Sequence, residues 1–372
     1  MAPLGRGTDV FVIGGGPAGL AAAIAARRKG FTVTVADGAE PPIDKACGEG
    51  MMPGTLTALQ ELGIELLPGV GYRFRGIRFV EDSTQVEAEF PVGQGIGVRR
   101  TLLHEALICE AEKLDVKLLW KRPVVGICAD GVRLNGVTAT ARWIVGADGG
   151  HSRVRRWSGL DFNVARSRRL ASRRHYRVSP WTEFVEIYWG PRIQVYVTPI
   201  SRDEVCVVAM GETVEHAEFD SALKALPELR DRLANAELCG RERGAITAMQ
   251  SLAHVCRGNV ALVGDASGGV DAITGEGMRL AFRQALALAE AMQGGDLREY
   301  EHAHRQLARR PFHMGRLMLQ LGRSDRTRSR MLKMLSRSPE LFARLLAIHV
   351  GRATSIDVVA TGAQLGWQFV AG

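Results

Sequence analysis

The sequence predicts an α/β fold in which a parallel βαβ domain is interleaved with a mostly antiparallel β-sheet domain and followed by a helical C-terminal segment. Three observations carry this prediction. A strand, a glycine turn, a helix and a second strand follow one another near the N-terminus. Aromatic and β-branched runs dominate residues 173–211, and only helical periodicity follows Asp296. At 372 residues the chain also exceeds one ordinary hydrophobic core, which favours joined domains.

The N-terminal unit starts with an apolar run, Asp9–Ile13, that ends in glycines. An Ala-rich helix is expected over Pro17–Lys29, closed by Gly30, and a second strand over Phe31–Ala36. The uncharged stretch that contains these glycines spans only 17 residues, which is short for a membrane helix. We therefore expect a soluble βαβ unit rather than a signal or membrane segment.

The later elements follow from the same periodicities. We expect helices over Leu56–Leu62, Thr101–Leu114, Asp220–Leu238 with a break at Pro227, Glu276–Met292, and one starting at Pro339 with Ser338 as its cap. We expect alternating strands between Tyr72 and Val98, and further strands over Val116–Trp120, Trp143–Ala147, Phe184–Trp189, Ile193–Val197, Val205–Met210 and Val260–Val263. The parallel domain is assigned residues 1–71, 99–165 and 251–295, the sheet domain residues 72–98 and 166–250, and the helical segment residues 296–372.

The turn after the first strand carries Gly14, Gly16 and Gly19 in the pattern Gly-x-Gly-x-x-Gly. The first glycine permits the tight turn, the second lets the backbone approach a pyrophosphate, and the third lets the helix pack on the strand. Pro17 and Ala18 complete the turn, and the helix N-terminus then faces the phosphate charge. The pattern predicts a Rossmann-type dinucleotide site.

Asp37 lies 18 residues after Gly19, at the end of the second expected strand. A carboxylate there is placed to accept a hydrogen bond from a ribose 2′-hydroxyl, and it would repel the 2′-phosphate of NADP. This unit alone allows either FAD or NAD.

Two later strands end in the pairs Asp148-Gly149 and Gly264-Asp265. Asp265 is placed to hold a hydroxyl of a ribityl chain, which NAD lacks. The stretch Gly275–Gly277 then opens a helix whose N-terminal N–H groups suit the pyrimidine edge of a flavin. Together these segments favour FAD.

In the order and spacing of these segments, residues 8–295 resemble the superfamily of single-component FAD-dependent monooxygenases of the aromatic hydroxylase type and their geranylgeranyl-reductase relatives. The start of the helix at Arg99–His104 is similar to the family's Arg-x-x-Leu-His/Asp pattern. By analogy, Arg100 should lie near FAD. The resemblance implies that the antiparallel sheet covers the flavin and the substrate, and that NAD(P)H, the expected electron donor, docks without a Rossmann site of its own.

Lys45–Pro53 is similar to the Lys-Pro-Cys-Gly-x-Gly loop of the geranylgeranyl-reductase branch. The resemblance places Lys45 at the cofactor and makes Cys47 a candidate to touch flavin or substrate, with Glu49 as a candidate proton donor or base. The alternative for Cys47 is a small buried apolar side chain. Against this branch, Gln194–Pro199 lacks the family's tryptophan, which also counts against halogenation, and residues 268–273 lack the proline of many hydroxylases.

The formal charge of +8 is unevenly placed. Residues 297–352 carry a net +9, and nine arginines lie between Arg153 and Arg177. The second cluster either docks the phosphates of NAD(P)H, with Arg168 and Arg169 as candidates, or is a solvated face. Six cysteines without a Cys-x-x-Cys pair exclude a disulfide framework or zinc ribbon, and they fit a cytoplasmic protein.

The basic C-terminal helices carry two apolar stripes, Met314–Leu321 and Leu341–Leu346. Either they pack on the host domain, or they cover a lipophilic substrate entrance, or they make a peripheral membrane contact through arginine. No recognition helix or stacking motif accompanies the charge, so nucleic acid is not expected as a partner. No metal site is expected either.

The resulting hypothesis is an FAD-dependent monooxygenase that uses NAD(P)H and O₂ to hydroxylate an apolar, electron-rich small molecule of aromatic or polyketide type. One alternative is a reductase of isoprenoid double bonds on the same scaffold. The other is a non-catalytic protein that binds FAD or lipid.

Overall fold

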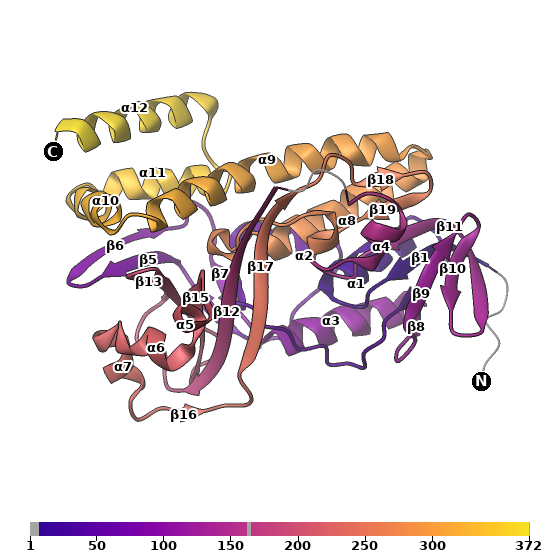
Figure 1. The fold of residues 1–372 in the computed structure, drawn as a ribbon, viewed down its shortest axis with the longest axis horizontal. Helices are drawn as coiled ribbons and strands as arrows, with labels where there is room; N and C mark the ends of the chain where they lie inside the picture. Colours follow the sequence, from indigo (N-terminus) through magenta and orange to yellow (C-terminus); the bar gives the residue numbers. More distant parts are fainter. Residues whose placement is uncertain (1–6, 162–164, 372) are drawn as a thin grey trace.

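The computed structural model describes residues 7–161 and 165–371, which two large β-sheets organise (Figure 1). The first sheet has the strand order β18-β19-β11-β1-β2-β8. These strands span Cys256–Arg257, Val260–Leu262, Val137–Gly146, Thr8–Ile13, Val33–Ala36 and Lys117–Leu119, respectively. The pairings from β19 to β8 are all parallel, so the carboxyl ends of these strands meet at one edge. The predicted parallel α/β unit is confirmed.

Helix α1 (Pro17–Arg28) is the centre of the layer that covers one face of this sheet. It packs against α3 (Arg100–Lys113) and α8 (Gly277–Gly294), and α2 (Pro53–Glu61) lies beside α8. Its alanines are almost fully buried, because small side chains let neighbouring helices approach closely. The hairpin of β9 (Val124–Cys128) and β10 (Gly131–Leu134) and the short α4 (Arg153–Trp157) contribute to a second apolar cluster. The sequence analysis did not predict this hairpin.

The second sheet has the order β16-β12-β15-β14-β13-β5-β6, with β17 paired to β12. Its strands span Glu237–Leu238 (β16), Ala165–Arg177 (β12), Glu204–Gly211 (β15), Ile193–Pro199 (β14), Phe184–Gly190 (β13), Gly76–Glu81 (β5), Thr84–Glu89 (β6) and Arg243–Ser251 (β17). All pairings are antiparallel except that of β13 with β5. The mostly antiparallel sheet is therefore confirmed, but the arginine-rich β12 extends well before the region predicted as strand, and β17 was not predicted.

Two smaller parts belong to the region before the C-terminal helices. A three-stranded sheet joins β3 (Gly50–Met51), β7 (Gly95–Gly97) and β4 (Tyr72–Phe74). The short helix α5 (Val214–Ala217) precedes the helical stretch expected over Asp220–Leu238, which consists of α6 (Phe219–Lys224) and α7 (Pro227–Leu233) with the expected break at Pro227, and its last two residues form β16 instead.

Four helices follow: α9 (Leu297–Gly322), α10 (Asp325–Arg337), α11 (Pro339–His349) and α12 (Ser355–Ala371). In Figure 1 the long α9 runs past both sheets, and α10 and α11 lie above β5 and β6. The stripe Leu341–Leu346 packs into the core of the second sheet, as the packing alternative predicted. A buried ion pair between Arg328 and Glu81, with Nε and Oε1 2.6 Å apart, joins α10 to β5.

Two further observations concern the ends of helices α11 and α12. Ser338 occupies the N-cap position before Pro339, as predicted, but its side chain makes no capping hydrogen bond. The last helix exposes Ile356, Val359 and Trp367. Among the helices of the described residues, none is both long and apolar enough to span a bilayer.

Candidate functional site

A cavity of about 830 Å³ runs from the carboxyl edge of the first sheet to one face of the second. It brings together nearly all residues that the sequence analysis selected: Gly14, Gly16, Pro17, Ala18, Asp37, Lys45, Cys47, Glu49, Arg100, Asp148, Gly149, Gly264, Asp265, Gly275 and Gly277. Gly19 does not line the cavity and instead lies inside the turn.

The glycine turn is shaped by close backbone contacts. Gly14 has φ of +112°, and a Cβ there would lie 2.4 Å from the carbonyl oxygen of Ala147. A Cβ on Gly19 would lie 1.8 Å from the carbonyl oxygen of Gly14. At Gly16, in contrast, a Cβ would meet nothing within 4 Å, because that position faces the cavity. Of these three glycines, only Gly16 therefore leaves room for a ligand.

Asp37 holds this turn in place as well as lining the cavity. Its Oδ2 accepts a hydrogen bond from the Gly15 amide at 2.7 Å, and its Oδ1 accepts from the Ala39 amide at 2.8 Å. The expected contact to a ribose hydroxyl remains a prediction, and it would share the carboxylate with these two amides.

The carboxylate of Asp148 is engaged with the start of helix α4. It accepts hydrogen bonds from the Ser152 hydroxyl, from the Arg153 amide at 2.7 Å and from the Val154 amide at 3.1 Å. What this segment offers to a ligand is therefore backbone, at Gly149, where φ is +82° and a Cβ would meet nothing within 4 Å.

Asp265 also lines the cavity and forms an ion pair with Lys45, whose Nζ lies 3.3 Å from Oδ2. Both side chains are about half exposed. Beyond them, Gly275 adopts the left-handed conformation (φ +63°) that the turn into α8 requires, and α8 begins at Gly277. The N-terminus of α8 thus lies at the cavity, where the sequence predicted it.

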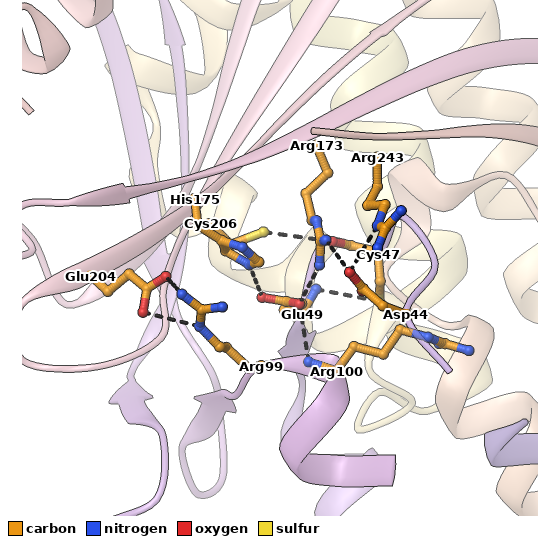
Figure 2. Close-up of polar contacts among 10 residues, drawn as sticks. All are labelled: Asp44, Cys47, Glu49, Arg99, Arg100, Arg173, His175, Glu204, Cys206 and Arg243. Carbon is orange, nitrogen blue, oxygen red and sulfur yellow. Dashed lines mark hydrogen bonds and ion pairs between the residues drawn. The ribbon is translucent and has the colours of Figure 1, made fainter. Parts of the chain in front are cut away.

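Residues 44–50 are here called the strap. Residues 45–50 line the cavity, and Glu49 makes the most hydrogen bonds among the strap residues (Figure 2). Its Oε1 accepts hydrogen bonds from Arg173 Nη1 at 2.9 Å and from the Arg100 amide at 3.0 Å. Its Oε2 lies 2.7 Å from His175 Nε2. Burial opposes ionisation, but the hydrogen bond and charge of His175, the Arg100 amide and the charge of Arg173 outweigh it and lower the pKa of Glu49.

Glu49 therefore stays ionised and fully bonded, which suits a structural role better than the expected role of proton donor. Cys47 lines the cavity and is half-buried; its Sγ accepts a weak hydrogen bond from the Glu49 amide at 3.4 Å. Its carbonyl oxygen lies 3.5 Å from the Sγ of Cys206. Burial raises the pKa of Cys206 well above its ordinary value, so Cys206 is a neutral thiol donor here.

The far end of the cavity is an apolar chamber that the sequence analysis did not identify as a site. Its walls are Met52, Phe74, Ile77, Ala171, Val185, Ile187, Tyr196, Thr198, Val208, Met210 and Ile273, together with residues 245–248 and Gln250 of β17. Period-two alternation in β13, β14 and β15 indicates which residues share a face, but it does not say which face lines a cavity. Tyr196 donates from Oη to Gln194 Oε1 at 3.2 Å, and burial raises its pKa, so it stays protonated.

The arginine cluster 153–177 is not one uniform basic face. Arg155, Arg169 and Arg173 are buried and bonded to acids; Arg169 Nη1 lies 3.0 Å from Asp271 Oδ1. For these three the solvated-face interpretation is wrong, and Arg169 is not available to a docking dinucleotide. Arg153 and Arg168 are exposed along the cavity, and neither has an ionic partner within residues 7–161 and 165–371.

The residues of the cofactor end fit FAD. The N-terminus of α1 has no side-chain cap, so its amides are free for a phosphate. Gly16, Gly149 and Gly277 all leave open space where a Cβ would stand. Arg100 Nε is buried without a hydrogen-bond partner in the described part of the chain, so a bound acceptor would satisfy it.

Comparisons with known proteins agree with this geometry. The profile of the family described as FAD binding domain matches residues 7–295. The chain is 29% identical to the menaquinone reductase of Mycolicibacterium smegmatis, covering 79% of this chain and 78% of the relative. It is 27% identical to the ubiquinone hydroxylase UbiL of Rhodospirillum rubrum, covering 76% and 72%. A flavoprotein/dehydrogenase structure from Cytophaga hutchinsonii shares the fold, with a TM-score of 0.79, 20% identity and 92% of each chain covered.

Proposed function

From the premise that this chain belongs to the family of FAD binding domains and is an FAD-dependent oxidoreductase, we propose that it hydroxylates a lipophilic, electron-rich ring compound with NAD(P)H and O₂. One observation carries the proposal. The cavity is continuous from the glycine turn to an apolar chamber, so a bound flavin and an apolar substrate would share one water-poor space.

Different residues along this cavity would bind the cofactor and orient the substrate. The amides at the start of α1 would bind the pyrophosphate, and those at the start of α8 would bind the pyrimidine edge of the flavin. FAD, when bound, supplies the redox chemistry, receiving hydride from NAD(P)H and passing electrons to oxygen. The chamber residues would orient the ring and exclude water.

The chamber favours hydroxylation because it offers few proton donors. Reduction of a carbon–carbon double bond needs a hydride and a proton delivered to neighbouring carbons. Glu49 is ionised and bonded to Arg173 and His175, and Tyr196 is protonated but donates to Gln194. Hydroxylation of an electron-rich ring requires mainly that the ring is oriented correctly and that water is excluded from the site.

Double-bond reduction is the second candidate, and Cys47 is the observation that favours it. Its thiol lines the cavity and accepts one weak hydrogen bond, so it is placed to give a proton. The relatives named for menaquinone and ubiquinone fit either candidate, since both quinones join a redox-active ring to an isoprenoid chain.

We assign the docking of NAD(P)H to the exposed Arg153 and Arg168 beside His151 at the cavity wall. Their uncompensated charge suits phosphate groups. Arg168→Glu is expected to raise KM for NADPH several-fold with little change in FAD affinity, and an unchanged KM would remove this assignment.

The test begins with reconstitution of the purified chain with FAD. A panel of lipophilic phenols and naphthoquinones, with and without isoprenoid chains, is then assayed for NADPH oxidation in air and without oxygen, and products are analysed by mass spectrometry. Products heavier by one oxygen atom, formed only in air, support hydroxylation. Products heavier by two hydrogen atoms, formed without oxygen from substrates with isoprenoid chains and unchanged in mass after reoxidation in air, support the second candidate; a quinone merely reduced to its quinol would lose the two hydrogen atoms again in air. A chain that binds FAD but never turns over with NADPH would indicate the binding-only alternative and overturn both.

A further inference from the structure

The strap is fastened at both ends to the second sheet through one arginine (Figure 2). Arg173 Nη2 donates to Asp44 Oδ2 at 2.9 Å, and Arg173 Nη1 donates to Glu49 Oε1 at 2.9 Å. Asp44 Oδ2 also accepts from Arg243 Nε at 3.1 Å. The segment between these two acids carries Cys47 and lines the cavity. The position of this segment therefore depends on Arg173, which lies on β12.

The ion pair with Glu49 is buried, with exposed side-chain fractions of 3% for Arg173 and 1% for Glu49. Taking both charges out of water is costly, and removal of one partner leaves the other uncompensated. Neither reaction proposed above uses Arg173 as a proton donor or a nucleophile. The contacts of this ion pair indicate that it holds the strap in position rather than taking part in the reaction.

The backbone supports the same interpretation. Glu49 has φ of +58°, a left-handed conformation that is uncommon for a residue with a side chain. Its carbonyl oxygen accepts from the Val98 amide at 2.9 Å, and its carboxylate accepts from the amide of Arg100 at the start of α3. A strained residue persists only where its surroundings over-determine it, and strained residues concentrate at functional sites.

We propose that Arg173 is a positioning residue: by holding Asp44 and Glu49 together it keeps the strap, and Cys47 within it, at a fixed depth against the flavin site. The inference rests on the proposed function in one respect, that the cavity holds FAD beside the strap. Because Arg173 lies on the sheet that also walls the substrate chamber, it sets the distance between the cofactor end and the substrate end of the cavity.

A metal ion is the competing explanation for this cluster. Ligand atoms of Glu49, His175 and Cys206 lie within 4.8 Å of one another. Arg173, however, already supplies the positive charge beside Glu49, and the Cys206 thiol donates a hydrogen bond to the carbonyl oxygen of Cys47. The geometry therefore points to a hydrogen-bonded lock.

The test compares Arg173→Gln and Arg173→Lys with wild type in two measurements that need no substrate. Hydrogen exchange of the apoprotein reports the opening of residues 44–50, and quenching of flavin fluorescence gives the Kd for FAD. We expect Arg173→Gln to speed exchange in the strap and to weaken FAD binding roughly tenfold, since a charged hydrogen bond is lost on each side. Arg173→Lys keeps the charge but not the bidentate geometry. Its strap exchange rate and its Kd for FAD should therefore lie between those of wild type and Arg173→Gln.

Arg78→Gln is the matched control. It removes an arginine–glutamate pair of the same length in the same sheet, with Arg78 Nη1 2.9 Å from Glu186 Oε1, in which Glu186 is buried and Arg78 is 21% exposed, and neither residue lines the cavity. Strap exchange and the Kd for FAD should stay at wild-type values in this variant. Faster strap exchange and a higher Kd for FAD in this variant would show that the effects of Arg173 are general loosening of the sheet, and would overturn the proposal.

The double variant Arg173→Gln/Glu49→Gln removes both charges, so it should be less destabilised than the two single variants together predict. Unchanged strap exchange and unchanged FAD affinity in Arg173→Gln would overturn the lock. If wild type itself binds no FAD, the proposed function fails, while the exchange comparison still decides whether Arg173 fastens the strap. Strap exchange that slows on adding Zn²⁺ would favour the metal explanation instead.

Discussion

The two ends of the cavity are built in different ways. At the cofactor end, the lining comes from short stretches in which backbone does most of the binding, such as Gly14–Ala18, Asp148–Gly150 and Gly275–Gly277. At the substrate end, single side chains arrive from β5, β12, β13, β14, β15 and β17. The shape of the cofactor end is determined by residues that are close together in the sequence, and the packed part of its turn leaves almost no space for added atoms. The substrate end is specified by strand pairing between distant residues, so its shape can change without loss of the fold.

The border between the two ends is where charge is buried. Glu49 and Asp271 come from segments next to the cofactor end, and Arg173 and Arg169 come from β12. These ion pairs join the halves, so the substrate chamber is held in register with the cofactor site by electrostatics as well as by packing.

The largest expected effect separates two glycines of the same turn. Gly19→Ala places a Cβ 1.8 Å from the carbonyl oxygen of Gly14, so the helix or the turn must move. We expect a loss of about 3 kcal/mol in the free energy of unfolding and no measurable FAD binding. Urea unfolding and flavin titration measure both quantities.

Gly16→Ala is the matched comparison, because Gly16 has an ordinary φ of −74° and open space at Cβ. The free energy of unfolding should change by less than about 0.5 kcal/mol. FAD affinity should nevertheless fall roughly tenfold, about 1.4 kcal/mol, because the methyl group occupies ligand space. If both variants lose stability equally, the cofactor end is not built around a ligand.

A second prediction concerns how α9 supports the cofactor end. His304 Nε2 lies 2.9 Å from the Ser267 hydroxyl, two residues after Asp265. Burial lowers the pKa of His304 to about 4. The unfolded chain, with a pKa of about 6.5, binds more protons between these values, so the stability falls as pH falls from about 6.5 towards 4. At pH 5 the loss is on the order of 2 kcal/mol.

Unfolding curves of wild type and His304→Gln at about pH 7.5, above this window, and at about pH 5, within it, check this prediction. The variant should lose less stability than wild type between the two. His313→Gln, at an exposed position on the same helix, should behave like wild type. Equal pH dependence in all three proteins would show that His304 is not held neutral.

The difference between the two ends also explains what could be predicted from the sequence. Gly14, Gly19 and Asp37 act within about twenty-five residues of one another, so their spacing alone indicated their roles. Arg169 and Arg173 resembled members of a basic patch, because their partners Asp271 and Glu49 lie 102 and 124 positions away. The first part of strand β12 was not predicted for the same reason: its many arginines obscured the strand pattern, and only pairing with β15 and β17 explains it.

The smallest expected effect tests whether the apolar chamber is the substrate site, using two tyrosines of the second sheet. Tyr196 lines the chamber and donates to Gln194 Oε1, whereas Tyr188 lies in a different core cluster and donates to Glu186 Oε2 at 2.8 Å. Either Tyr→Phe change should cost about 1 kcal/mol in the free energy of unfolding and leave FAD affinity unchanged. Only Tyr196→Phe should alter KM or kcat for a lipophilic substrate, by a few-fold, because only its ring borders the cavity. The two variants differ by position rather than by chemistry, so a kinetic change in both, or in neither, would place the substrate outside the chamber.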